Sequence, residues 1–186
     1  MSSTAPAPRP RLAWLYTIGG GLGLLAAIAL TLEKIAKLRD PGYIPICSVD
    51  AVVSCGSVMD SAQAAAFGFP NPLLGIAAFA VVVTTGVAML AGFAPPRWYR
   101  VGLWVGTLFG VVFVHWLMVA SLYDIRALCP YCMVVWAVMI PLFLYCSLDT
   151  WPRLAPVRKV HREVLALWYV VVVLSVVIAF WDYFTG

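Results

Sequence analysis

The chain has 186 residues, of which 63% are hydrophobic and 11% are charged, and its formal net charge is +4. Soluble globular proteins contain roughly 45–50% apolar and about 25% charged residues, so this composition excludes an ordinary soluble domain. It also excludes a disordered chain, a nucleic-acid-binding module and a secreted disulfide scaffold.

Five apolar stretches are each long enough to cross a bilayer, which takes about 20 residues. They cover approximately residues 12–32, 73–93, 101–123, 127–148 and 164–181. The first stretch exceeds the roughly 7–15 residues of a signal-peptide core, so we expect a retained anchor. The Pro-, Ser- and Ala-rich residues 1–11 before it are predicted to be a disordered cytoplasmic tail. The sequence therefore predicts an all-α integral membrane protein with five transmembrane helices.

The charges between these stretches predict an orientation. With the N-terminus inside, the inner segments hold eight Lys and Arg residues against four outside, and six of the eight acidic residues lie outside. The positive-inside rule therefore places the N-terminus in the cytoplasm and the C-terminus outside. The first connecting loop, residues 33–72, then faces outwards. Connections this long are uncommon in compact proteins, which indicates a functional role.

Four of the five cysteines fall on this outer face. Cys47 and Cys55 lie in the long loop, and Cys129 and Cys132 form a Cys-Pro-Tyr-Cys motif where the fourth stretch begins. The outer face is the side of a cell membrane on which disulfides persist. Cys146 lies near the cytoplasmic end of the fourth stretch, and we expect it to fill space in the core.

The Cys-x-x-Cys motif is well placed for redox chemistry. At the start of a helix the two sulfurs can meet across one turn, and Pro130 occupies the first turn, where a missing N–H costs little. The free amides and the helix dipole favour thiolate, the reactive form of cysteine. Burial of Cys132 in the bundle would bring it to a lipid-soluble electron carrier. Two structural disulfides remain an alternative, and a closed zinc site fits less well because Cys47 and Cys55 lack the usual close spacing.

At these residues the sequence resembles the vitamin K epoxide reductase (VKOR) family, over roughly residues 12–148. The family has a loop cysteine pair separated by seven residues, here Cys47 and Cys55, and a Ser or Thr that follows it, here Ser61. The segment Asn71-Pro72-Leu73-Leu74-Gly75 is similar to the family's second-span opening. The fifth span is typical of the stand-alone bacterial form. The resemblance implies a VKOR-like membrane domain over 12–186, with four helices bundled around a quinone and a peripheral fifth helix.

The resemblance also implies a mechanism. A soluble thioredoxin-like (DsbA-like) thiol oxidase, reduced by its substrates, would pass electrons to the Cys47–Cys55 disulfide. Thiol–disulfide exchange, expected from Cys55 to Cys129, would carry them to the second pair. Cys132 would then reduce menaquinone or ubiquinone. The chain would act in the bacterial inner membrane as a thiol:quinone oxidoreductase that supports disulfide formation.

Four further residues are candidates to bind the quinone, namely Ser61, Asn71, Leu74 and Trp136. On residue type alone, Asn71 could equally be a helix cap and Ser61 a small polar residue of the loop. Trp136 stands where the vertebrate enzymes have a tyrosine, four residues after the second cysteine of the motif. Because an indole cannot act as a phenol does, we favour a quinone over an epoxide as the acceptor.

Two other functions stay open at the level of sequence. One keeps the scaffold but makes vitamin K quinone or epoxide the substrate, and the other is a non-enzymatic membrane assembly protein with structural disulfides. No metal site is expected. His115 is the one ionisable residue well inside a predicted span, which marks it as a functional candidate, although interhelical hydrogen bonding is the role that we favour.

Overall fold

The structure, a computed structural model, describes residues 10–185, and the regular elements in this part of the chain are all helical. The predicted disordered tail falls outside the described residues except for Pro10 and Arg11, which are already helical. Five helices are long and apolar enough to cross a membrane: α1 (Pro10–Arg39), α3 (Asn71–Leu90), α4 (Arg97–Val119), α5 (Pro130–Thr150) and α6 (His161–Ala179). The short elements are α2 (Cys55–Asp60), η1 (Ala62–Ala65), the π-helical turn η2 (Ala120–Ile125), η3 (Pro152–Leu154), η4 (Val157–Lys159) and α7 (Trp181–Thr185).

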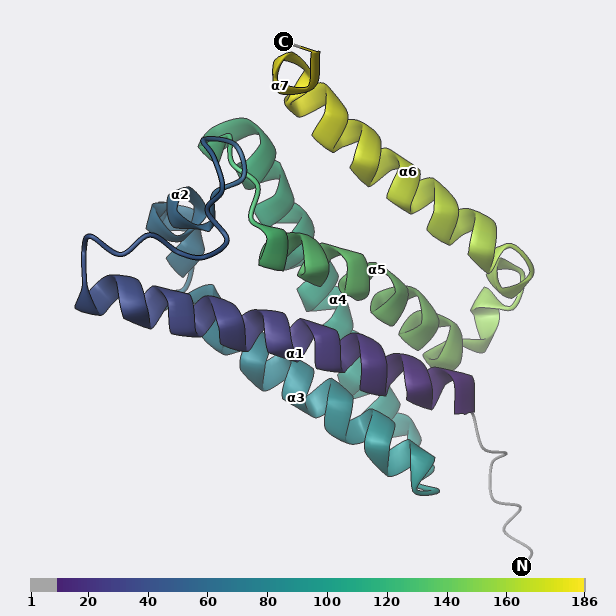
Figure 1. Cartoon of the computed structure of the whole chain (residues 1–186). Coiled ribbons are helices and arrows are strands. Elements are labelled where there is room, and N and C mark those ends of the chain that lie inside the picture. Colours follow the sequence, from purple (N-terminus) through teal and green to yellow (C-terminus); the bar gives the residue numbers. More distant parts are fainter. Residues whose placement is uncertain (1–9, 186) are drawn as a thin grey trace, which may run out of the picture.

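Four of the long helices form a bundle and the fifth lies beside it. Helix α1 packs against α3 and α5, and α4 packs against α5 (Figure 1). Helix α6 returns along the outside of α5, and only 6% of its most apolar window is buried, against 50% for α5. The predicted four-helix bundle with a peripheral fifth helix is therefore confirmed.

Close packing of α1 against α3 depends on glycines. A Cβ atom at Gly23 would lie 2.4 Å from the ring of Phe79, and one at Gly86 would lie 2.6 Å from the backbone nitrogen of Thr17. Small residues allow membrane helices to approach each other at such distances. These contacts hold α1 and α3 closely against each other along one side of the bundle.

The structure corrects the predicted boundaries at the end of the bundle that carries the cysteine loop, here called the outer end. Helix α1 continues to Arg39, seven residues beyond the predicted span, so the connection to α3 covers residues 40–70 and not 33–72. The prediction stopped at the first charged residue because it counted apolar length, whereas Glu, Lys, Ala, Leu and Arg are all good helix formers. Helix α5 begins at Pro130, three residues later than predicted, because Leu128 lies in a β-bridge and Cys129 is extended. Within this connection the chain forms two short helices, α2 and η1.

Candidate functional site

A short backbone pairing brings the two cysteine motifs together. Val53 and Leu128 form an isolated parallel bridge. The amide of Ser54 donates to the carbonyl of Leu128 at 2.9 Å, and the amide of Leu128 donates to the carbonyl of Val52 at 2.7 Å. Cys129 follows Leu128 directly and Cys55 lies two residues after Val53, so this pairing brings Cys55 beside Cys129.

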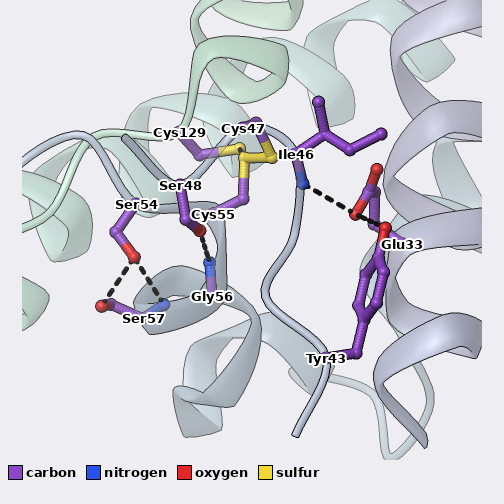
Figure 2. The surroundings of a disulfide bond; sticks show 10 residues. All are labelled: Glu33, Tyr43, Ile46, Cys47, Ser48, Ser54, Cys55, Gly56, Ser57 and Cys129. Atoms are coloured by element: carbon purple, nitrogen blue, oxygen red, sulfur yellow. Dashed lines mark hydrogen bonds between the residues drawn. A yellow bond between two sulfur atoms is a disulfide. The ribbon is translucent and has the colours of Figure 1, made fainter. Parts of the chain in front are cut away.

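Three cysteine sulfurs lie in direct contact at this point. Cys47 and Cys55 form a disulfide with a Cα–Cα distance of 5.6 Å, and the Cys129 Sγ atom lies 3.1 Å from the Cys55 Sγ atom (Figure 2). Cys129 and Cys132 are free thiols. Cys55 and Cys129 are fully buried, whereas Cys47 keeps 8% of its surface exposed. The arrangement places Cys47 outermost and aims Cys129 at the inner sulfur of the disulfide.

The surroundings of Cys129 favour its ionised form. Cys129 is the N-cap residue of α5, so its side chain faces the unpaired amides of the first helical turn. A hydrogen bond from the Cys132 thiol lowers the pKa of Cys129, and the backbone amides of Cys132 and Tyr131 lower it further, while burial works against them. A thiolate is the nucleophile in disulfide exchange, so this environment activates Cys129 for attack on a neighbouring disulfide.

The outer extension of α1 holds the segment that leads to Cys47. The buried carboxylate of Glu33 accepts hydrogen bonds from the Tyr43 hydroxyl at 3.0 Å and from the Ile46 amide at 3.3 Å (Figure 2). The hydrogen bond to Glu33 raises the pKa of Tyr43, which keeps the phenol protonated as a donor. Glu33 thus fixes the backbone directly before Cys47.

Two lysines of α1 hold α2 in the same way. Lys34 donates to the carbonyl of Met59 at 2.8 Å, and Lys37 pairs with the carboxylate of Asp60. Met59 packs against the buried cysteines, so these contacts hold α2 against the disulfide. The three charges that end the predicted first span are therefore the residues that anchor the cysteine loop.

Ser48 and Ser54 order the backbone around the disulfide. The Ser48 hydroxyl accepts a hydrogen bond from the Gly56 amide at 3.1 Å, and Ser54 caps α2 by accepting from the Ser57 amide at 3.2 Å (Figure 2). N-cap serines of this kind satisfy amides that a helix start leaves unpaired. Both bonds hold Cys55 at the first position of α2.

A cavity of about 540 Å³ runs through the bundle from this site. Its walls are mainly apolar side chains of α3 and α4, and it extends from Asn71 at the outer end to Tyr99 at the inner end. Its volume lies in the range of roughly 300–1,000 Å³ that is usual for small-molecule sites. Cys132 lines the cavity, as do all four predicted quinone-binding residues, namely Ser61, Asn71, Leu74 and Trp136.

Comparison with known proteins agrees with this geometry. The profile of the vitamin K epoxide reductase family matches residues 14–147. The chain belongs to this family. The mouse protein "Vitamin K epoxide reductase complex subunit 1" is 29% identical over 135 residues, an alignment that covers 64% of this chain and 81% of the mouse protein. Membership makes the chain a multi-pass membrane oxidoreductase of the quinone and epoxide type that works through cysteines, and the predicted family is confirmed.

The polar groups of Ser61 and Asn71 also have structural partners. The Asn71 amide nitrogen donates to the carbonyl of Gln63 at 2.7 Å, and its oxygen accepts from the Ala66 amide at 3.1 Å. Pro70 is the N-cap of α3, so Asn71 does not cap its own helix but fastens η1 to it. Ser61 donates to the carbonyl of Val58 at 2.7 Å. Both residues shape the outer end of the cavity. Direct contact between either side chain and a quinone stays a prediction.

His115 and Cys146 have the structural surroundings that the sequence favoured. The indole N–H of Trp168 on α6 donates to Nε2 of His115 at 2.9 Å, and Nδ1 lies 2.7 Å from the Val111 carbonyl. In this pattern Nδ1 donates and Nε2 accepts, and the Trp168 bond ties α6 to α4. Cys146 is 1% exposed within the core.

Sequence reasoning missed Glu33, Lys34 and Lys37 as residues of the site. Their signal was visible as a cluster of charges directly after the first apolar stretch, on the side where the cysteines lie. The Val53–Leu128 bridge had no comparable signal, because a pairing of one residue on each strand has no periodicity that a sequence can display.

Proposed function

We propose that this VKOR-family chain reoxidises a soluble thioredoxin-like thiol oxidase and passes the electrons through its two cysteine pairs to a membrane quinone, thereby supporting disulfide formation. The observation that carries the proposal is the 3.1 Å separation of the Cys55 and Cys129 sulfurs. A bond between these atoms needs only a small movement. Inert structural disulfides have no need of a third, activated cysteine at this distance.

The internal transfer is a pair of balanced exchange steps. With the loop cysteines reduced and the second pair oxidised, the Cys55 thiolate attacks the Cys129 sulfur. The Cys55–Cys129 bond forms, the Cys129–Cys132 bond breaks, and Cys132 leaves as a thiolate. The Cys47 thiolate then attacks Cys55, which forms the Cys47–Cys55 disulfide and releases Cys129. Two electrons have then moved inwards, and the cysteines are in the redox state that the structure contains.

The cavity supports a quinone as the final acceptor. Cys132 lines an apolar space large enough for a ring and part of an isoprenoid tail, which fits a lipid-soluble carrier. A quinone bound there would supply an acceptor for two electrons and two protons, leaving Cys129 and Cys132 joined. Trp136 offers an apolar wall one turn below Cys132 but no phenol, which supports a quinone over an epoxide as the acceptor.

The exposed surface around Cys47 supports a protein as the electron donor. Cys47 is the outermost sulfur, and its neighbours Ile46 and Val49 are 80% and 77% exposed. Apolar side chains beside a reactive disulfide suit the apolar surface that surrounds the active site of thioredoxin-like proteins. The distribution of basic residues supports a cytoplasmic N-terminus and an outer cysteine face in the bacterial inner membrane.

The test is reconstitution of the whole chain in lipid with a reduced thioredoxin-like protein and either menaquinone or ubiquinone. The proposal expects quinone reduction that requires the thiol protein and all four outer cysteines. Withdrawal of quinone should leave both pairs reduced in a thiol-trapping assay. Pairs that never change redox state would support structural disulfides, and turnover of vitamin K epoxide without quinone turnover would support the epoxide reductase.

A further inference from the structure

The C-terminal turn contacts the segment between Cys47 and Cys55. Helix α7 follows α6 at the end of the molecule where the cysteine loop lies (Figure 1). The Tyr183 hydroxyl donates to the Oδ2 atom of Asp50 at 2.8 Å, across 133 residues of sequence. Neither residue belongs to the motifs that carry the redox chemistry, and the contact joins the fifth span to the reactive loop.

Asp50 is the residue that shapes this segment. Its second oxygen, Oδ1, accepts hydrogen bonds from the amides of Val52 at 2.8 Å and Val53 at 2.7 Å. The amide of Val49 donates to the carbonyl of Val53 at 2.8 Å and closes the same turn.

The turn presents Val52, Val53 and Ser54 to Leu128, and this pairing sets Cys55 beside Cys129. The amide of Val53 and then the Tyr183 hydroxyl lower the pKa of Asp50, so the acceptor is a carboxylate.

The same C-terminal turn also contacts the other strand of the pairing. Phe180 is 3% exposed, although most of α6 is open to its surroundings. The guanidinium of Arg126 lies 5.4 Å from the centre of the Phe180 ring, and Arg126 adopts a left-handed conformation with φ of 57° two residues before Leu128. The turn from Phe180 to Tyr183 therefore contacts both segments whose pairing aligns the sulfurs.

We propose that Tyr183 is a positioning residue for the internal transfer, which holds the Cys47–Cys55 segment in the register that aims Cys129 at Cys55. The proposal rests on the cysteine-to-cysteine transfer proposed above. Exchange requires the two sulfurs to approach in line, so its rate depends on the fraction of time for which the segment is paired with Leu128. Loss of this exposed hydrogen bond to a carboxylate should lower that fraction about two- to threefold.

The test measures this exchange alone, without partner or quinone. The parent chain carries Cys132→Ala and Cys146→Ala, with the Cys47–Cys55 disulfide formed. The Cys129 thiolate attacks Cys55, the Cys55–Cys129 bond forms, and the Cys47 thiolate leaves. Excess maleimide alkylates Cys47 and locks the new bridge, whose rate of appearance is followed by non-reducing peptide mapping.

Tyr183→Phe in this parent should slow bridge formation about two- to threefold while leaving the aromatic ring and the starting disulfide in place. Tyr123→Phe is the matched control, because Tyr123 is 55% exposed at the same end of the molecule, and it should leave the rate unchanged. In an Asp50→Ala background, Tyr183→Phe should have no further effect, because its acceptor is absent.

The outcomes separate the two proposals. Equal rates in the parent and Tyr183→Phe would overturn the positioning role, as would a slowing by Tyr183→Phe that persists in Asp50→Ala. A parent chain that forms no Cys55–Cys129 bridge would overturn the transfer route itself and with it the role of Tyr183. A lower apparent melting temperature of Tyr183→Phe, together with an unchanged rate, would assign the contact to stability alone and also overturn the proposal.

Discussion

Cys129 and Cys146 lie at opposite ends of α5 and are almost equally hidden, with exposures of 0% and 1%. Cys129 lies at the N-terminal end of the helix, faces backbone amides and a second thiol, and is 3.1 Å from a disulfide sulfur. Cys146 is about 25 Å further along the helix, and its hydrogen-bonding neighbours are the hydroxyls of Tyr16, Thr107 and Thr150.

Burial therefore does not distinguish the cysteine that we propose to react from the one that fills the core. What differs is the set of neighbours, namely unpaired amides, a donor thiol and an exchange partner for one residue, and hydroxyls within a packed core for the other. The same contrast divides the molecule. At the outer end, hydrogen bonds and the Lys37–Asp60 ion pair hold the cysteine loop to α1, whereas close packing holds α1 against α3 at the inner end.

The largest effect is expected from removal of single sulfurs. Replacement of Cys47, Cys55, Cys129 or Cys132 by Ala should lower partner-dependent quinone reduction by a factor of about 10³ or more, as loss of a nucleophile does in other enzymes. Cys146→Ala should retain activity close to that of the unmodified chain. Steady-state quinone reduction measures both, and a Cys146→Ala variant as inactive as the others would break the contrast between the two ends of α5.

The second prediction uses the difference in exposure within the loop disulfide. Cys55→Ala leaves Cys47 without a resolving thiol, so a mixed disulfide between Cys47 and a thioredoxin-like partner should become the main trapped species. Cys47→Ala should trap far less partner, because Cys55 is fully buried whereas Cys47 is 8% exposed. Peptide mapping after alkylation identifies the bonded cysteine. Partner found mainly on Cys55 or Cys129 would reverse the proposed order of the sulfurs.

The third prediction tests the inner end as a purely structural region. Gly86→Ala places a Cβ atom 2.6 Å from the backbone of Thr17 and should destabilise the fold by about 1–3 kcal/mol. Gly21→Ala is the matched control, since its Cβ atom meets nothing within 4 Å and it makes the same change inside a helix. Apparent melting temperature in detergent reports the difference. Equal melting temperatures would remove the close α1–α3 contact as a source of stability.

The smallest effect concerns the ionisation of Cys129. Its pKa is lowered chiefly by the hydrogen bond from Cys132, so its thiolate should persist to lower pH than an ordinary thiol. In a chain with both loop cysteines replaced by Ala, Cys132→Ala should shift the pH profile of Cys129 alkylation upwards. Cys132→Ser keeps a donor and should shift it less. If both variants kept the profile of the chain that retains Cys132, the helix amides alone would activate Cys129.

Sequence predicted the parts of this protein that depend on local composition. Apolar length identified the five long helices, and the position of Cys129 before Pro130 placed the motif at a helix start. The predicted quinone-binding residues all line one cavity: Ser61 lies between α2 and η1, Asn71 begins α3, and Trp136 lies one turn below Cys132.

The contacts that align the sulfurs could not be predicted in the same way. The Val53–Leu128 bridge joins two isolated residues, and the Tyr183–Asp50 hydrogen bond joins residues 133 positions apart. Contacts of this kind depend on how the finished helices are placed, which no local pattern encodes. The length of α1 was underestimated for a related reason, because Glu33 and Lys34 end the apolar run without ending the helix.

The central claim is that both cysteine pairs lie on one path to the quinone, and electron counting tests it most directly. Fully oxidised chain in lipid is mixed with excess reduced thioredoxin-like protein in the absence of quinone, and its thiols are counted by mass after alkylation. We predict four new thiols, at Cys47, Cys55, Cys129 and Cys132, and the return of both disulfides with matching hydroquinone when quinone is added. New thiols at Cys47 and Cys55 alone, with the Cys129–Cys132 pair unchanged, would contradict the relay.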